Sequence, residues 1–333
     1  MQVLRDRARE GSEPGKRTDG YKVALAIEGG GNRGCVSAGM ASALYEAGLL
    51  STVDAVYGSS SGSVTAAWLL SSDFRRGVEA WAHADSFTPY ANFGNLLRRR
   101  PFLDLERLMA HLFDRVLQLD YESILTNPIS LHPLATDMGS GAAMDLNPHL
   151  RCARSLVLAI LASSAWPLLT GPPVRLGGRR YLDAAIAEPV PLATPLAAGV
   201  THLLVLRSRS DGHPSMFGSL RRHFGALWMR QYGTALWQAY HRGATSAAQL
   251  NVNLHNRSLP PTVLVVPPAA DLRRLKSLES DHRLIGAALA AGRATFTELL
   301  RSHGMATVPA PRQEVNRPRV SVAGTDSSQG DRG

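Results

Sequence analysis

The chain contains very little cysteine. Cys35 and Cys152 are the only two cysteines among 333 residues, too few for a disulfide framework, which indicates a reducing compartment. The eleven histidines form no H-E-x-x-H or close H-x-H pattern, and the two cysteines lie far apart. Because these are the spacings typical of metal ligands, we expect no metal and no other cofactor.

Long apolar runs are also missing. A membrane-spanning helix needs about 18 consecutive apolar residues, and the best candidate, Val157 to Leu169, is interrupted by Ser163, Ser164 and Pro167. The polar opening, residues 1–20, lacks the apolar core of a signal peptide. We therefore expect a cytoplasmic protein without a spanning helix.

Lysine is scarce, although the chain is basic. Lys16, Lys22 and Lys276 are the only lysines, while Lys and Arg together number 36 against 27 Asp and Glu, a net charge of +9. A cationic, arginine-rich surface attracts anionic lipid headgroups and nucleic acids alike, but the chain has no nucleic-acid-binding motif. We expect no nucleic-acid partner; the charge leaves open a transient, peripheral contact with the anionic inner face of a membrane.

Two arginine clusters are the best candidates for such a contact. They are Arg98–Arg100 and Arg221–Arg222, and each lies beside apolar residues. A solvated helix face that also packs on the core explains the same pattern and is the favoured interpretation.

The composition predicts one sizeable globular unit. With 44% hydrophobic residues, the chain can bury a large core, and strand-like runs alternate with helical ones, which favours an α/β fold with a mainly parallel sheet covered on both faces. The polar ends, residues 1–20 and 308–333, are predicted to be disordered tails. The folded domain then spans 21–307, with a helical, cap-like segment at about 72–125.

A G-x-S-x-G motif formed by Gly58, Ser60 and Gly62 follows the apolar run that ends at Tyr57. Such a motif places a serine on a sharp turn between a strand and a helix, and the glycines remove side chains that would crowd it. On the motif alone, a Gly/Ser turn that caps the following helix is the favoured interpretation.

A glycine-rich loop precedes this motif by about one βα unit. After the apolar run 23–27 come Glu28, then Gly29, Gly30 and Gly31, and then Arg33. Unobstructed backbone N–H groups at a helix start bind an anion, either a phosphate or the oxyanion that forms when a serine attacks an ester. A dinucleotide site is less favoured because no acid follows the next strand; Asp54 precedes it.

A serine nucleophile needs a base, and Asp183 is the candidate. It follows a short hairpin-like segment, 172–182, and precedes Ala184 and Ala185. For an isolated aspartate at a strand end, a turn or cap role is the more common one; the sequence around Asp183, residues 162–167 and 188–191, favours the base.

With these three motifs, the chain resembles the patatin-like phospholipase family over roughly residues 21–305, and is most similar to its compact bacterial branch. The resemblance implies a three-layer α/β sandwich and a lipid ester substrate. It implies that Ser60 is the nucleophile and Asp183 its partner in a Ser-Asp dyad. The oxyanion hole would then be surrounded by Gly29, Gly30, Gly31 and Arg33, and Gly58 and Gly62 would be the elbow glycines.

One residue departs from the family pattern. The family has glycine after the aspartate, and this chain has Ala184; if that position requires a positive φ, the alanine tilts the carboxylate. The expected function is a serine lipid acyl hydrolase of phospholipase A, lysophospholipase or acylglycerol esterase type that forms an acyl-enzyme. A weakened, lipid-binding family member is an alternative.

Two further alternatives stay open. An ordinary α/β-hydrolase would use a Ser-Asp-His triad with His202, His241 or His255 as the base, and a nucleotide-binding protein would hold phosphate on the glycine loop.

A helical period predicts one amphipathic helix between the serine motif and the aspartate. Its apolar positions are Leu105, Leu108, Met109, Leu112, Phe113 and Val116. Core packing is the favoured role for this face. The other role is a lid over Ser60, with the stretch 86–101 providing its mobility.

Overall fold

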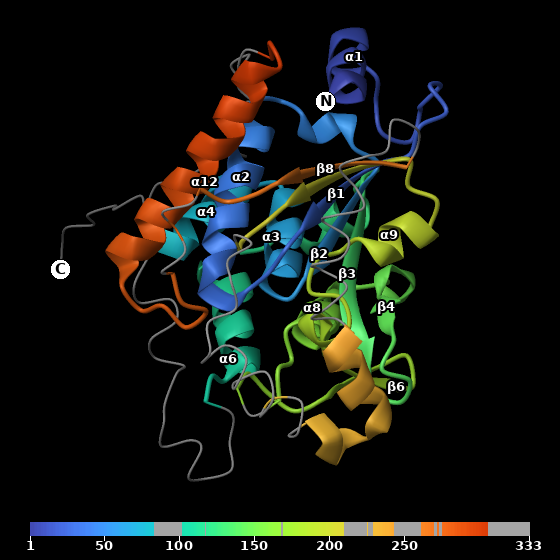
Figure 1. Ribbon diagram of the computed structural model, residues 1–333, viewed down its shortest axis with the longest axis vertical. Coiled ribbons are helices and arrows are strands. Elements are labelled where there is room, and N and C mark those ends of the chain that lie inside the picture. The colour runs from blue at the N-terminus through green and yellow to red at the C-terminus, as the bar shows by residue number, and fades with distance from the viewer. Residues whose placement is uncertain are drawn as a thin grey trace, which may run out of the picture.

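The structure is a computed structural model, which describes residues 1–82, 102–116, 118–167, 169–209, 225, 229–242, 261–269, 272 and 275–305. Within these residues, eight strands form one sheet in the order β5-β6-β3-β2-β1-β7-β8, with β4 paired to β3 (Figure 1). The strands are β1 Val23–Ile27, β2 Ala55–Ser59, β3 Ser130–Asp137, β4 Ala143–Asp145, β5 Val174–Leu176, β6 Arg179–Asp183, β7 His202–Leu206 and β8 Thr262–Val266.

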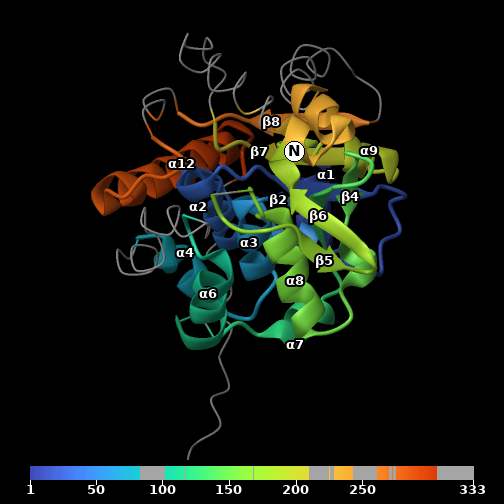
Figure 2. The ribbon, with the colours of Figure 1, turned by 90° about the horizontal axis from the view of Figure 1, so that it is seen from below.

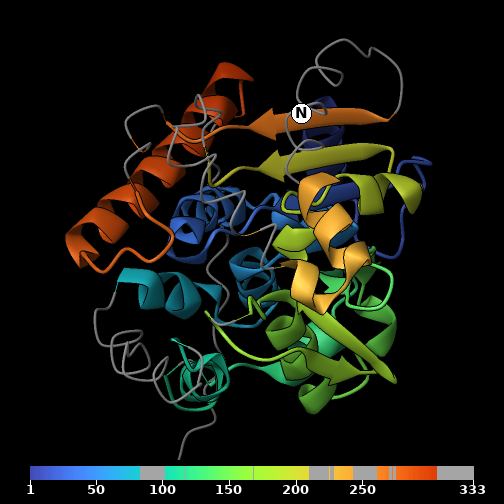
Figure 3. The same cartoon turned by 60° about the horizontal axis from the view of Figure 1, so that its bottom comes forward.

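Five of these strands, β3, β2, β1, β7 and β8, run parallel, whereas β4, β5 and β6 are antiparallel to their partners. The helices are α1 Gln2–Glu10, α2 Gly34–Glu46, α3 Ser61–Leu69, α4 Phe74–Ala82, α6 Leu105–Ala110, α7 Tyr121–Leu125, α8 Ala153–Ser163, α9 Ala193–Ala197 and α12 His282–Ser302. Figure 3 shows β7 and β8 at the edge of the sheet that lies away from β5 and β6.

Both faces of the sheet are covered, so the three-layer, mainly parallel α/β prediction is confirmed. Strand β1 is buried along its whole length, and its alternating residues enter two different cores. Leu25 and Ile27 join the large core formed with α2, α3 and α12, whereas Ala24 and Ala26 face a smaller core around Val190 and Leu192. Figure 2 shows α2, α4 and α12 on one side of the sheet and α9 on the other.

Helices α2 and α12 pack backbone against backbone (Figure 1). A Cβ on Gly39 of α2 would collide with the carbonyl oxygen of Leu289 in α12, and a Cβ on Gly292 of α12 would collide with that of Val36 in α2. The two glycines therefore set the close approach that covers the sheet on this side.

The predicted helix at 105–116 forms, but in two parts. It consists of α6 followed by a π-helical turn, His111–Val116. Its apolar side chains Leu105, Leu108, Met109, Leu112 and Phe113 are buried in the large core, which accords with the core-packing interpretation. The side chain of Val116 and the stretch 86–101 lie outside the described residues, so the lid stays a prediction.

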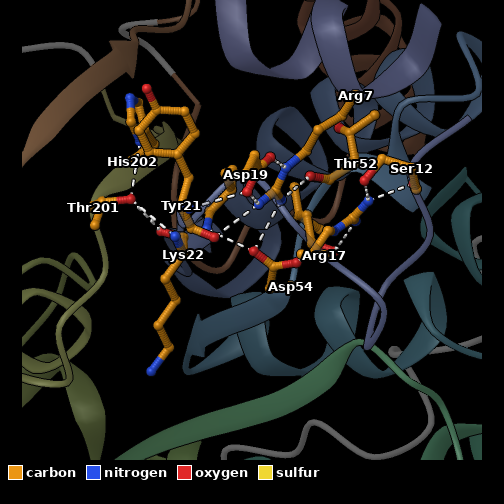
Figure 4. Close-up of polar contacts among 12 residues, drawn as sticks. Arg7, Ser12, Arg17, Asp19, Tyr21, Lys22, Thr52, Asp54, Thr201 and His202 are labelled. Carbon is orange, nitrogen blue, oxygen red and sulfur yellow. Dashed lines mark hydrogen bonds and ion pairs between the residues drawn. The ribbon is translucent and has the colours of Figure 1, made fainter. Parts of the chain in front are cut away.

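The prediction of a disordered tail over residues 1–20 is wrong. Residues 2–10 form α1, and the side chain of Arg7 is 99% buried, with 1% relative exposure. Its Nε lies 2.6 Å from Asp19 Oδ2, and its Nη1 lies 2.9 Å from Asp54 Oδ2 and 2.7 Å from the carbonyl oxygen of Thr52 (Figure 4). The polar composition of residues 1–20 predicts disorder, but the charged side chains neutralise one another and dock α1 on the domain.

These contacts also affect the acids. The hydrogen bond from Arg7 lowers the pKa of Asp19 to about 2, and Asp54 is held by Arg17 as well, at 2.9 Å from Arg17 Nε. The predicted tail at 308–333 lies outside the described residues, and the domain limits 21–307 and 72–125 remain predictions.

Replacing Arg7 with alanine tests this docking. We expect Arg7→Ala to lower the free energy of unfolding by about 2 to 4 kcal/mol, because it leaves Asp19 and the carbonyl groups of Thr52 and Tyr21 without this partner. It also removes one of the two arginines that hold Asp54. Arg9→Ala is the matched control, since Arg9 is exposed on the same helix. Chemical denaturation measures both, and equal stabilities of the two variants would contradict the docking.

Candidate active site

Ser60 stands on a strained turn between β2 and α3. Its backbone has φ 55° and ψ −128°, a region that side-chain-bearing residues rarely occupy and that costs of order 1 to 3 kcal/mol. Its N–H donates to Ser163 Oγ at 2.9 Å. The strand, the turn and the helix thus present the Ser60 hydroxyl at the carboxyl edge of the sheet, as the G-x-S-x-G motif predicts.

The two elbow glycines are required by close backbone contacts. A Cβ on Gly62 would collide with the carbonyl oxygen of Ile27 at the end of β1, and a Cβ on Gly58 would lie 2.6 Å from the backbone nitrogen of Ser63. Gly58 therefore lets the chain fold back on itself, and Gly62 lets α3 start directly against β1.

The glycine-rich loop after β1 packs directly on this elbow. A Cβ on Gly29 would collide with the carbonyl oxygen of Ser59 and would lie 2.9 Å from Ser60 Cβ. Gly30 and Gly31 have φ 144° and 63°, and the N–H of Gly30 donates to Ser61 Oγ at 3.1 Å. The loop leads through the 3₁₀ turn Gly31–Arg33 into α2.

Arg33 ends that turn and lies over the loop. A Cβ on Gly30 would be 3.4 Å from Arg33 Nε. The structure therefore brings Gly29 against Ser60 and Arg33 against Gly30, whereas the Cβ position of Gly31 faces the carbonyl oxygen of Ser277.

Strand β3 lies between β2 and β6 and places Asp183 next to Ser60. Leu134 of β3 pairs with Ser59, and the next residue, Ala135, pairs with Asp183. Ser60 Oγ donates a hydrogen bond of 2.9 Å to Asp183 Oδ2, and the N–H of Ala185 donates one of 2.8 Å to Oδ1. Each carboxylate oxygen thus has a defined donor.

Burial dominates the electrostatics of Asp183. The residue is only 4% exposed, and burial raises its pKa to about 6, against the opposing effects of the Ala185 N–H, the Ser60 hydroxyl and the charge of Arg209. A carboxylate with this pKa is a stronger base than an exposed aspartate and is still ionised at neutral pH.

Ala184 does not strain the backbone. It starts the 3₁₀ turn Ala184–Ile186 and is buried. Among the described residues other than glycine, only Ser60 and Gln118 have a positive φ, so the position after Asp183 does not need glycine here. The backbone of Ala184 therefore gives no reason for the Asp183 carboxylate to tilt.

A buried acid, Glu28, was not predicted as a site residue. It is fully buried, and its carboxylate lies 2.8 Å from Arg207 Nε, 2.9 Å from the backbone nitrogen of Ser208 and 2.7 Å from Arg209 Nε. Burial opposes its ionisation, but Arg209 and Arg207 outweigh burial and lower its pKa. The sequence carries a signal for this cluster, since Glu28 opens the glycine loop and the two arginines follow β7 directly.

The histidines of the alternative triad are placed differently. His202 lies at the start of β7, beside Val23 of β1 and in ring contact with Tyr21. This is the amino end of the parallel strands, whereas Ser60 lies at their carboxyl end. His241 contacts the rings of Trp237 and Tyr240, and His255 lies outside the described residues, as do Arg98–Arg100 and Arg221–Arg222.

Among the described residues, no group of three or more His, Cys, Asp and Glu side chains is arranged to hold a metal ion. No helix in that part of the chain has both the length and the apolar character to cross a membrane.

Comparison with known proteins gives the family. The family model described as patatin-like phospholipase matches residues 25–196, more than half of the chain. The chain therefore belongs to the patatin-like phospholipase family, which is a family of lipid acyl hydrolases. The matched residues include the glycine loop, the elbow and Asp183.

Among 13 solved chains that match is VipD from Legionella pneumophila, with 14% sequence identity, a TM-score of 0.39, and coverage of 85% of this chain and 67% of that one. Comparison with curated proteins gives no match.

The contact between the elbow and β1 can be tested with one methyl group. We expect Gly62→Ala to lower the free energy of unfolding by about 2 to 4 kcal/mol, because the Cβ has no space beside Ile27. Gly286→Ala in α12 is the control: nothing lies near its Cβ position, and alanine should stabilise that helix by about 0.5 to 1 kcal/mol. Thermal and chemical unfolding measure both, and a neutral Gly62→Ala would refute the contact.

Proposed function

We propose that the protein is a serine lipid acyl hydrolase of phospholipase A, lysophospholipase or acylglycerol esterase type, in which Ser60 and Asp183 form the catalytic dyad. The observation that carries the proposal is the direct hydrogen bond of 2.9 Å from Ser60 Oγ to a buried carboxylate. Nucleophile and base within this distance satisfy the geometric requirement for nucleophilic catalysis.

In the first step, Asp183 Oδ2 accepts the hydroxyl proton while Ser60 Oγ attacks the ester carbonyl carbon. The C–O bond to the leaving alcohol then breaks, the proton passes from Asp183 to that alcohol, and the acyl group stays on Ser60 as an ester. The Ala185 N–H holds the other carboxylate oxygen, so Oδ2 keeps its direction toward Ser60.

The oxyanion of this step needs hydrogen-bond donors. We assign this role to the backbone amides of the Gly29–Gly31 loop other than that of Gly30, which already donates to Ser61 Oγ, with Arg33 as a nearby positive charge. The packing of Gly29 on Ser59 and Ser60 supports this assignment, because it holds the loop in place before substrate arrives and thereby avoids reorganisation during the reaction.

In the second step, a water molecule replaces the alcohol. Asp183 takes a proton from the water, the hydroxyl oxygen attacks the acyl carbon, and Ser60 leaves with the proton that Asp183 returns to it. The fatty acid is released and the dyad is restored.

The substrate is a lipid ester, and the enzyme would meet it at a surface. The net charge of +9 supports a transient contact with anionic lipid on the cytoplasmic face of a membrane. No nucleic-acid partner is part of the proposal.

Labelling with a fluorophosphonate tests the dyad. We expect one adduct on the wild-type chain and none on Ser60→Ala, since the reagent phosphonylates an activated serine. Asp183→Asn should react about 100-fold or more slowly, because it lacks the base. Intact-mass spectrometry measures the adducts.

Ser71→Ala is the control for this experiment. Ser71 lies beyond the end of α3 and its hydroxyl bonds to the carbonyl oxygen of Trp68, so its loss should leave the labelling unchanged. A folded wild-type chain that takes up no label, or an adduct that persists on Ser60→Ala, would contradict the assignment. The first of these results would favour a lipid-binding protein without turnover.

The pH dependence of activity should report Asp183. The base works only when ionised, and its pKa is raised to about 6, so kcat/KM should fall as the pH drops through about 6 and be full at higher pH. The profile is measured between about pH 4.5 and 9 on an uncharged ester. His202→Gln and His241→Gln should keep the same acidic limb; its disappearance in either variant would support a histidine base instead.

A further inference from the structure

Arg209 is an arginine held in place beside the candidate site by a buried acid. Its Nε bonds to Glu28 Oε1 at 2.7 Å, and Glu28 also bonds to Arg207 Nε at 2.8 Å. The Glu28 side chain has no exposed surface and the Arg207 side chain is 8% exposed, whereas Arg209 is 38% exposed. Of the three charged side chains, that of Arg209 is the most exposed.

Two guanidinium groups share the one carboxylate of Glu28, which stays ionised because its pKa is lowered. Of these two guanidinium groups, that of Arg209 is the more exposed. Within the described residues, Arg209 uses only Nε in the hydrogen bonds of its side chain, so its two terminal nitrogens remain as donors.

The cluster is attached to the loop beside Ser60. Ser208, between the two arginines, donates through its hydroxyl to the carbonyl oxygen of Gly29, and Gly29 lies directly against Ser60. Arg209 is thus linked through Ser208 and Gly29 to the elbow that carries Ser60. Its charge also lowers the pKa of Asp183.

We propose that Arg209 binds the phosphate group of the substrate and makes the enzyme prefer phosphate-bearing lipid esters over neutral acylglycerols with the same acyl chain. The inference rests on the proposed function. A guanidinium presents paired N–H donors that match two oxygens of a phosphate. The bond to Glu28 fixes the guanidinium beforehand, which reduces the ordering cost of binding.

Two substrates that differ only by the phosphate give the sharpest test. We would measure kcat/KM for 1-oleoyl lysophosphatidic acid and for 1-oleoylglycerol, each in micelles of an uncharged detergent, and take their ratio. Arg209→Gln should lower the ratio by about tenfold or more, since a charge-assisted contact to phosphate is lost. Arg209→Lys should lie between, because lysine keeps the charge but not the paired donors.

The pH and the overall charge need controls. Removal of Arg209 also raises the pKa of Asp183, because Arg209 lowers it; the comparison is therefore made at about pH 8, where the carboxylate is ionised in both proteins. Arg301→Gln removes the same charge from an exposed site near the end of α12 and should leave the ratio unchanged. An equal fall on both substrates, or an unchanged ratio in Arg209→Gln, would overturn the inference.

A binding measurement separates this inference from the proposed function. If the wild-type chain hydrolyses neither substrate, the proposed function fails, and calorimetric binding of decyl phosphate still tests Arg209. The inference expects decyl phosphate to bind wild type about tenfold or more tightly than Arg209→Gln, and inorganic phosphate to bind much more weakly than decyl phosphate. Equal binding to the two proteins, or equal binding of the two phosphates, would overturn the phosphate-bearing lipid as the ligand.

Discussion

The contact between the glycine loop and the serine elbow is the constraint on which the site depends. The end of β1, the loop and the start of α3 approach so closely that Gly29 and Gly62 have no room for a Cβ. The close approach places the backbone of the loop beside Ser60 and starts α2 and α3 from neighbouring points. The parallel pairing of β1 with β2 makes this possible, because it brings the carboxyl ends of both strands to the same edge.

Two buried carboxylates near this contact have opposite environments. Glu28 is surrounded by two guanidinium groups and a backbone N–H, so it stays ionised and holds the loop and the end of β7 together. Asp183 receives only neutral donors at short range, the Ser60 hydroxyl and the Ala185 N–H, and burial raises its pKa. The lowered pKa suits Glu28 to a structural role, and the raised pKa suits Asp183 to the role of a candidate base.

Much of the fold and of the candidate site could be predicted from the sequence, because the signals are local. The glycines mark turns that only glycine allows, and apolar runs followed by such turns mark the strand ends that carry Ser60 and the loop. Long-range pairing left no local signal. The antiparallel pairing of Ala135 with Asp183, the docking of α1 through Arg7, and the ion pairs from Glu28 to Arg207 and Arg209 join segments 47 to 181 residues apart. Charged residues at such separations resemble solvated surface until the fold brings their partners together.

The central claim is that the acyl group passes through Ser60. The most direct measurement is mass spectrometry of the protein after rapid acid quenching during turnover of a lipid ester, with peptide mapping of the mass added. The account predicts an acyl group on the peptide that contains Ser60. If the pH is dropped below about 6 after acylation, this acyl group should persist longer, because protonated Asp183 can no longer activate water. Release of fatty acid with no acyl group on Ser60, or with the acyl group on another residue, would contradict the account.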